Sequence, residues 1–293
     1  MNIVVKDHRS EVTIAPELGA SILAYNYIAN QKTVAIFPNR IGAADVKNTS
    51  CFPLVPFSNR IRDGKFTWQG SEIKLPLNQF PERHSNHGHG WQVSWDIDEQ
   101  TPSSVTLSYL HKASEWPFTY KTKYHFELQN GELLQTLTLI NLSPEDMPAG
   151  LGLHPYFSRT AQASVIAKVN QMWQVDHESM PVKVVEAPVC IQSKLGLVID
   201  SHQLDNTFIN FPAKAEVFWP EWRMSADITA SSNCDFMVVY SPKGEDFFCL
   251  EPVTHLPDAV NLHHQGVEKT GFASLKPGKE MSIWMRIAPK PLS

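Results

Sequence analysis

The 293-residue sequence has few cysteines, no long apolar run and little excess charge, and each shortage excludes a class of protein. Its four cysteines lack C-x-x-C spacing, which favours buried free thiols over a disulfide framework. No stretch approaches the roughly 20 apolar residues that cross a bilayer, so no membrane partner is expected. The net charge of −5 is accompanied by no basic stripe, which argues against a nucleic-acid partner.

The composition is that of a folded globular protein, with 42% hydrophobic and 19% charged residues. Proline and glycine are spread along the chain and form no linker, so we expect a single domain over residues 1–293. The first residues, MNIVVKDHRSEVTI, have no basic start followed by an apolar run, which predicts a cytoplasmic location. The sequence leaves a monomer and a homodimer equally open.

Short segments that alternate apolar and polar residues recur along the chain, as half-buried strands do. Residues 119–128 read TYKTKYHFEL, and Asn130-Gly131 follows, the pair that a type I′ hairpin turn favours. LLQTLTLIN at 133–141 then predicts the returning strand. Three further segments read in the same way: residues 104–110, 236–241 and 281–288. The pattern predicts an all-β protein, a large β-sandwich or barrel with a concave face.

Glu251 attracts attention because a carboxylate ends an apolar run, in DFFCLEP at 246–252. Partial burial at the end of such a strand raises the pKa of a carboxyl group and makes it a competent base near neutrality. The alternative is a carboxylate at the rim of the fold that pairs with an arginine. The local sequence leaves both interpretations open.

His154 ends a second apolar run, in AGLGLHPYF at 149–157. One interpretation is a core histidine that is hydrogen-bonded to the backbone, which is the commoner case. The other is a general acid, because an imidazolium can give up a proton near pH 7.

Three histidines occur close together in HSNHGHGWQVSW, residues 84–95. Alternation on a strand would place His87 and His89 on one face, where a third ligand could complete a divalent-metal site. No second spaced pair of ligands accompanies them, so the signal for a metal is weak. His84 is expected to be a solvated loop residue.

Other polar and aromatic residues have both a structural and a binding interpretation. Trp95 is expected to pack in the core, whereas an exposed Trp91 beside polar residues would suit stacking on a sugar ring. Asp205 lies in LDNTF, which is ordinary turn chemistry. Arg60 is either a surface residue at a hairpin or a multi-donor group for hydroxyl or carboxylate oxygens.

Five segments, taken in order, resemble the motifs of the aldose 1-epimerase (galactose mutarotase) family over most of the chain. NRIRDGKF resembles the N-R-I-x-x-G-x-F element, and NHGHGWQVSW resembles the H-G element with a tryptophan downstream. GLHPYF resembles the second histidine motif, and LDNTF a segment with a sugar-binding aspartate. LEPVTHLPDAVN resembles the E-P-x-T-x-x-P-x-A-x-N element. Each is weak alone, but five in the right order are a specific signal.

The resemblance implies a galactose mutarotase-like supersandwich and an isomerase that interconverts the α and β anomers of a free aldohexose such as galactose or glucose. It implies that Glu251 is the general base, that His154 is the general acid and that His87 assists at the anomeric oxygens. The sugar hydroxyls would contact Asn59, Arg60, Tyr156 and Asp205. The reaction involves no redox change or group transfer, so no cofactor and no metal are implied.

The assignment carries two further expectations. His89-Gly90 is also an H-G pair, and His87 is preferred because of its distance to Trp95. The acid and base roles need Glu251 ionised and His154 protonated together, a state that their mutual attraction would favour.

Three alternative functions are kept beside this one. A hexose-6-phosphate 1-epimerase of the same superfamily would need an arginine cluster, and the arginines here are dispersed in sequence. A non-catalytic carbohydrate-binding protein would use the same aromatic residues without a general acid and base. A cupin-like metal enzyme would use His87, His89 and one further ligand.

Overall fold

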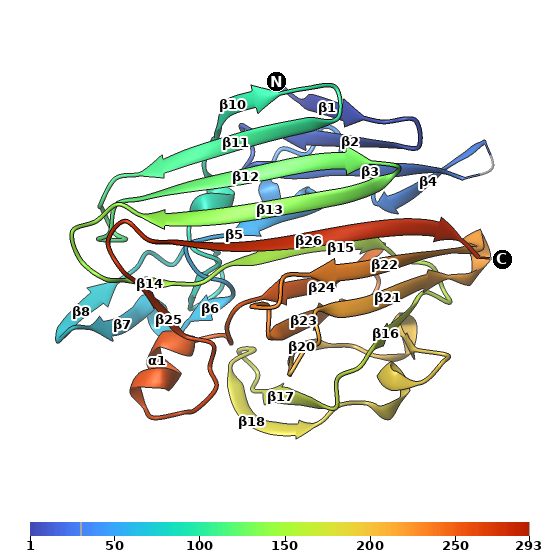
Figure 1. Ribbon diagram of the computed structural model, residues 1–293. Helices are drawn as coiled ribbons and strands as arrows, with labels where there is room; N and C mark the ends of the chain where they lie inside the picture. The colour runs from blue at the N-terminus through green and yellow to red at the C-terminus, as the bar shows by residue number, and fades with distance from the viewer. Residues whose placement is uncertain (30, 293) are drawn as a thin grey trace.

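The structure is a computed structural model that describes residues 1–29 and 31–292, and it consists mainly of antiparallel strands. Two large sheets pack face to face. Figure 1 shows β11, β12, β13 and β26 as one broad layer, with β3, β5 and β15 behind it. Within the described residues the one α-helix is α1 (Ala259–His264), and no helix is long and apolar enough to span a membrane. The predicted all-β sandwich is confirmed.

The first sheet has eleven strands. In spatial order they are β1 (Ile3–Lys6), β2 (Ser10–Ala15), β3 (Ser21–Ala29), β5 (Cys51–Leu54), β15 (Gly152–Ser158), β24 (Phe247–Val253), β23 (Phe236–Tyr240), β20 (Asp205–Ile209), β17 (Gln171–Val175) and β18 (Pro181–Glu186), with β4 (Lys32–Phe37) paired to β3.

The second sheet has nine strands. In spatial order they are β10 (Asp96–Gln100), β11 (Ser104–His111), β12 (Tyr120–Gln129), β13 (Glu132–Asn141), β26 (Glu280–Pro291), β22 (Met224–Ala230), β21 (Lys214–Trp219), β16 (Ser164–Ala167) and β19 (Leu197–Val198).

Smaller elements cover the ends of the sandwich. The two-stranded sheets pair β6 (Arg60–Ile61) with β9 (Ser85–Asn86), β7 (Lys65–Trp68) with β8 (Ser71–Lys74), and β14 (Met147–Ala149) with β25 (Ala273–Leu275). The 3-10 turns are η1 (Val46–Asn48), η2 (Arg62–Gly64), η3 (Gly90–Gln92), η4 (Val189–Gln192), η5 (Ile199–Ser201) and η6 (Pro220–Trp222).

The strand predictions agree with the structure. β12 and β13 form the expected hairpin, in which Gln129 pairs with Glu132. The turn residues Asn130 and Gly131 have φ of 56° and 89°, the positive values that a type I′ turn requires. The other three segments correspond to β11, β23 and β26.

The main hydrophobic core fills the space between the two large sheets. It includes Phe157 and Leu250 from the first sheet and Tyr124, Leu137 and Ile283 from the second. Trp95 joins it, as predicted. All four cysteines are free thiols; Cys51, Cys234 and Cys249 are buried, and Cys190 is half-buried.

Strand alternation places a different set of side chains on the outer face of the first sheet. Leu153 and Phe157 of β15 point into the main core, whereas His154 and Tyr156 alternate with them and belong to the opposite face. β24 lies next to β15 and places Glu251 on this same face. The centre of the first sheet therefore brings residues 154 and 251 together, although they are far apart in the sequence.

Candidate active site

His154 and Glu251 face each other on adjacent antiparallel strands. His154 Nε2 lies 3.4 Å from Glu251 Oε1. Both residues are buried, with 7% and 2% of their surface exposed. His154 stacks on Phe52 of β5, with ring centroids 4.5 Å apart. This stacking fixes the imidazole plane, so that Nε2 points at the carboxyl group.

The pair lies at the base of a cavity of about 490 Å³ that opens to solvent. Ligand pockets usually have a volume of about 300–1,000 Å³, so a monosaccharide fits with room for water. The cavity is lined by Phe52, Asn59, Arg60, His87, Trp91, His154, Tyr156, Asp205 and Glu251, together with polar residues at its mouth. All seven residues expected to carry the site therefore line one cavity.

His87 enters this cavity from the segment after β9 and is held by two backbone contacts with Asn59. The Asn59 N–H donates to His87 Nδ1 at 3.0 Å, and the His87 N–H donates to the Asn59 carbonyl oxygen at 2.9 Å. Because Nδ1 accepts, neutral His87 carries its proton on Nε2. Burial, and then His154 and Arg60, lower the pKa of His87 well below its usual range. His87 is therefore a neutral hydrogen-bond donor.

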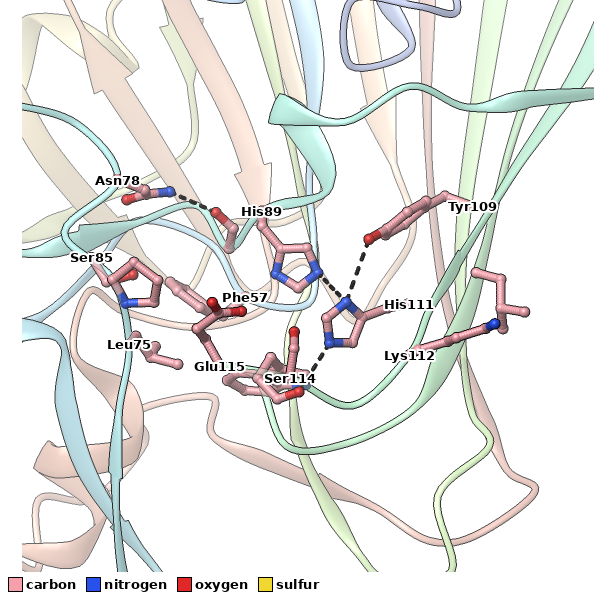
Figure 2. A pocket seen from close by; sticks show the side chains of 14 residues that line it. Phe57, Leu75, Asn78, Ser85, His89, Tyr109, His111, Lys112, Ser114 and Glu115 are labelled. Atoms are coloured by element: carbon pink, nitrogen blue, oxygen red, sulfur yellow. Dashed lines mark hydrogen bonds between the residues drawn. The ribbon is translucent and has the colours of Figure 1, made fainter.

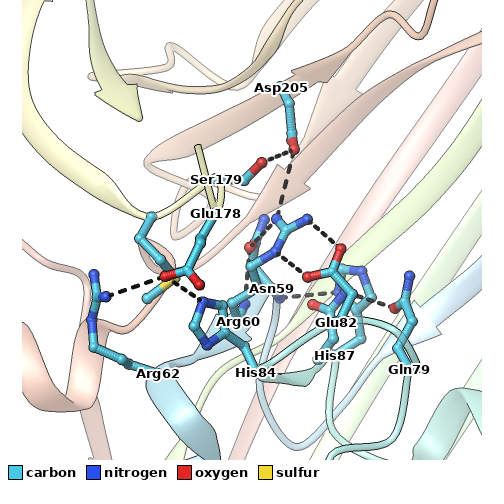
Figure 3. Close-up of polar contacts among 12 residues, drawn as sticks. Asn59, Arg60, Arg62, Gln79, Glu82, His84, His87, Glu178, Ser179 and Asp205 are labelled. Atoms are coloured by element: carbon cyan, nitrogen blue, oxygen red, sulfur yellow. Dashed lines mark hydrogen bonds and ion pairs between the residues drawn. The ribbon is translucent and has the colours of Figure 1, made fainter. Parts of the chain in front are cut away.

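Arg60 lies at the mouth of the cavity between two acidic residues, as Figure 3 shows. Its Nε lies 3.4 Å from Glu82 Oε2, and its Nη1 lies 3.7 Å from Asp205 Oδ2. Asp205 also accepts a hydrogen bond of 2.7 Å from the Ser179 hydroxyl. Asp205 is the first residue of β20. Its contacts with Arg60 and Ser179 make it part of a charged network, so it is more than a turn residue.

The charge state of the central pair differs from the one expected from sequence. Burial raises the pKa of Glu251 well above its usual range, with Asp205 adding to the effect and Arg60 opposing it. Burial lowers the pKa of His154 to about 3. Loss of hydration outweighs the attraction between the two groups, so a carboxylic acid beside a neutral imidazole is favoured. That form and the ion pair contain the same protons and differ by one proton transfer across 3.4 Å.

A support not predicted from the sequence lies behind Asn59. The Ser58 N–H donates to His255 Nε2 at 3.1 Å, while His255 Nδ1 donates to the Leu256 carbonyl oxygen at 2.7 Å. The Asp258 N–H donates to the Arg60 carbonyl oxygen at 2.7 Å. The residues after Glu251 thus hold the segment that carries Asn59 and Arg60. The corresponding signal in the sequence is His255, which lies in the LEPVTHLPDAVN segment.

His84 is not a solvated loop residue, and that expectation is wrong. Only 1% of it is exposed, and its Nδ1 accepts a hydrogen bond of 3.1 Å from the Asp63 N–H. Its Nε2 lies 3.8 Å from Glu178, which also lies 4.0 Å from Arg62. Figure 3 shows this second network beside Arg60. Its role is to join the segment before β9 to the turn between β17 and β18.

His89 points into a separate cavity of about 470 Å³, which Figure 2 shows. The segment is not an alternating strand there, because His87 and Gly88 have φ of 60° and 67°. His89 Nε2 lies 2.8 Å from His111 Nδ1 and 2.9 Å from the Tyr120 hydroxyl. The proposed metal site of His87 and His89 is therefore wrong, and His87 is the histidine that accompanies His154.

Other residues of the cavity carried no sequence signal. Lys47, Gln79, Glu82, Ser179, Tyr240, Glu245 and Phe247 also line it. Among the described residues, one set of donors suited to a metal ion converges: atoms of His154, Cys249 and Glu251 lie within 4.8 Å of one another. Trp91 is only 1% exposed and stacks on Phe52 at 5.3 Å, so it supports the cavity wall.

Comparison with known proteins identifies relatives over nearly the whole chain. The family model described as aldose 1-epimerase matches residues 1–288. The uncharacterized protein YphB of Escherichia coli K12 is 30% identical over 248 residues, which cover 82% of this chain and 83% of YphB.

Solved structures share the fold. A candidate aldose 1-epimerase from Escherichia coli K12 superposes with a TM-score of 0.88 at 24% identity, covering 100% of this chain and 99% of that one. A galactose mutarotase-like protein from Clostridium acetobutylicum gives a TM-score of 0.87 at 19% identity, covering 99% of this chain and 95% of that one. These two likenesses establish the supersandwich fold.

Proposed function

The chain belongs to the aldose 1-epimerase family, and we propose that it interconverts the α and β anomers of a free, neutral aldohexose such as galactose or glucose. The observation that carries the proposal is the opposed His154–Glu251 pair, 3.4 Å apart at the base of a sugar-sized cavity. Ring opening requires two proton-exchanging groups that reach the C1 hydroxyl and the ring oxygen, and these two oxygens are bonded to the same carbon.

The reaction opens a cyclic hemiacetal, lets the chain rotate about C1–C2 and closes the ring on the other face of the carbonyl group. Opening removes a proton from the C1 hydroxyl and adds one to the ring oxygen. Glu251 takes the first proton as a carboxylate, and His154 gives the second as an imidazolium; the roles reverse on closure. Each such group contributes about 10²–10⁴-fold in rate.

Oxygen atoms of the substrate would form the hydrogen bonds that His154 and Glu251 lack in the buried site. Glu251 Oε2 and His154 Nδ1 have no hydrogen-bond partner among the described residues. A hydroxyl group at Glu251 stabilises its carboxylate form, because hydrogen bonds to a charged group favour the charge. Sugar binding thus moves the shared proton from Glu251 to His154 and prepares the pair for ring opening.

His87 and the cavity wall would hold the sugar in place. The Nε2–H of His87 is the donor suited to an anomeric oxygen, because its Nδ1 is already occupied by Asn59. Asn59, Arg60, Tyr156 and Asp205 would contact the other hydroxyl groups. Burial keeps the pKa of Tyr156 well above its usual range, so its phenol remains a donor.

The charges at the mouth favour a neutral sugar over a phosphorylated one. Arg60 is already engaged by Glu82 and Asp205, and Glu245 adds a further carboxylate to the lining. Lys47 is exposed and is the one other cation that lines the cavity within the described residues. A sugar phosphate would have to compete with these carboxylates for Arg60, which costs binding free energy.

Polarimetry on freshly dissolved α-galactose, α-glucose and their 6-phosphates tests the proposal. We expect the protein to accelerate the approach to equilibrium of the free sugars, with kcat/KM at least about tenfold lower for the phosphates. No acceleration above the spontaneous rate with any sugar would reject the activity. Preference for a phosphate would reject the neutral-sugar assignment.

A further inference from the structure

A free thiol lies directly beneath the proposed acid–base pair. Cys249 is two residues before Glu251 on β24, so strand alternation gives both side chains the same face of the sheet. It pairs with Tyr156 of β15 in the sheet register. Cys249 is fully buried in the smaller apolar cluster that lies under the cavity. The mechanism proposed above makes no use of this thiol.

The geometry of the three side chains is close to that of a metal site. Ligand atoms of His154, Cys249 and Glu251 all lie within 4.8 Å of one another. Zinc bonds of about 2.0–2.3 Å in a tetrahedral arrangement place ligand atoms roughly 3.3–3.7 Å apart. The distance of 3.4 Å from His154 Nε2 to Glu251 Oε1 is already in that range. The other ligand-atom distances, which are at most 4.8 Å, would have to shorten by about 1 Å at most for an ion to bind.

The donor types select the kind of ion. Imidazole, thiolate and carboxylate are the ligands of Zn²⁺, whereas Mg²⁺ and Ca²⁺ prefer oxygen ligands alone. His154 Nε2 faces Glu251 Oε1 and is the ring nitrogen placed to share an ion with it. Glu251 is 2% exposed, and its Oε2 has no hydrogen-bond partner among the residues that the structure describes. The fourth coordination position would face the cavity, where water can enter.

We propose that His154, Cys249 and Glu251 form an inhibitory site for a thiophilic divalent cation such as Zn²⁺. The ion binds the two groups that must exchange protons with the sugar, and it anchors on Cys249. Binding releases two protons to solvent, one from the thiol and one from the pair, so the charge balances. The effect on turnover rests on the proposed function, whereas the binding site itself does not.

Titration with Zn²⁺ alone tests the site without any sugar. We expect one ion per chain by calorimetry in wild type, and a sulfur-to-metal charge-transfer band with Co²⁺ as the spectroscopic probe. Cys249→Ser should weaken Zn²⁺ binding at least about tenfold and abolish that band. Cys249→Ala serves as a second variant if the serine destabilises the fold, and thermal unfolding checks both.

Cys190→Ser is the matched control for metal binding at other thiols. Cys190 is half-buried, and its Sγ lies 3.8 Å from His202 Nε2, so it offers a comparable pair of donors at a distance from the cavity. We expect Cys190→Ser to bind Zn²⁺ as wild type does. Loss of binding in the control, or unchanged binding in both Cys249 variants, would overturn the proposal.

Anomerisation assays then separate the site from the function. Zn²⁺ should inhibit wild type reversibly, with recovery on addition of chelator, while Mg²⁺ at the same concentration has no effect. The Cys249 variants should need at least about tenfold more Zn²⁺ for the same inhibition. Cys249-dependent binding in a protein without anomerase activity would support the site and reject the proposed function. Anomerase activity without stoichiometric Zn²⁺ binding would support the proposed function and reject the metal site.

Discussion

The segment from Ser85 to Trp91 contributes to two cavities of nearly equal volume, about 490 Å³ and 470 Å³. Both contain histidines whose pKa values burial lowers, to about 3 for His154 and about 4 for His89. In the second cavity His89 contacts His111 and Tyr120, and His111 in turn contacts the Trp116 carbonyl oxygen, so these histidine and tyrosine atoms have partners. Trp116 also lines this cavity, and its Nε1 is buried without a hydrogen-bond partner among the described residues.

The first cavity differs because atoms of its titratable pair lack partners. Glu251 Oε2 and His154 Nδ1 are both buried without a hydrogen bond in the described part of the chain. A buried polar group without a partner costs free energy, which a functional site tolerates and a structural one seldom does. The two cavities are therefore similar in volume and histidine content, and they differ in whether their titratable side chains have hydrogen-bond partners.

The largest expected effect comes from removing the proposed acid in the first cavity. His154→Asn should lower kcat/KM for galactose by about 10²–10⁴-fold, because the ring oxygen loses its proton donor. The double variant with Glu251→Gln should be little worse than the single one, since the two groups act as a unit. Polarimetry measures both, and thermal unfolding confirms that the variants are folded. Normal turnover in His154→Asn would refute its assignment.

A smaller loss is expected from the support behind Asn59. His255→Leu removes the acceptor of the Ser58 N–H, and the loop that positions Asn59 and Arg60 should shift. We expect kcat/KM to fall by roughly tenfold to a hundredfold, because small displacements of positioning groups have effects of that size. His255→Gln, which keeps an acceptor, should retain more activity. Equal losses in both variants would count against a positioning role.

The pH dependence of stability should report the neutral histidines of both cavities. A histidine with a lowered pKa contributes stability that is present above the unfolded pKa near 6.5 and is lost as the pH falls towards its folded pKa. His87 in the first cavity and His89 in the second should each contribute a slope of about 1.4 kcal/mol per pH unit over that range. His154 should contribute little net slope, because the raised pKa of Glu251 beside it acts in the opposite direction.

Denaturant titrations between pH 7 and pH 4.5 measure this dependence. The free energy of unfolding should fall with acidification, and His89→Asn should have a shallower slope than wild type. A stability that rises on acidification through this range would contradict the neutral state of these histidines.

The smallest effect on activity is expected in the second cavity. His89→Asn should leave kcat/KM within about twofold of wild type, because the imidazole of His89 lies outside the first cavity. It should destabilise the fold by about 1–3 kcal/mol, since His111 and Tyr120 lose a partner. A loss of activity as large as that of His154→Asn would remove the distinction between the two cavities.

The fold, and the grouping of the residues that line the first cavity, could be predicted from the sequence. Alternation gave the β12–β13 hairpin, and motif order placed Glu251, His154 and His87 at one site. The burial of His84 could not be predicted, because its partner Glu178 lies far away in the sequence, on the turn between β17 and β18. The separation of His87 from His89 depends on positive φ at His87 and Gly88, which no pattern of residue types reveals.

The charge state of His154 and Glu251 could not be predicted from the sequence either. Charge attraction between His154 and Glu251 is evident from residue types, whereas the competing loss of hydration depends on how completely both are buried. Tertiary packing decides whether attraction or loss of hydration is the larger effect. Here the loss of hydration is larger, so the favoured state has Glu251 protonated and His154 neutral, the opposite of the state expected from the sequence.

The most direct test of the central claim is magnetisation exchange between the α and β anomers of galactose at equilibrium, recorded by NMR with wild type and Glu251→Gln. The substitution keeps the shape of the side chain and removes its ability to take up a proton. The account predicts rapid exchange with wild type and exchange at the spontaneous rate with Glu251→Gln. Equal exchange with both proteins would contradict it.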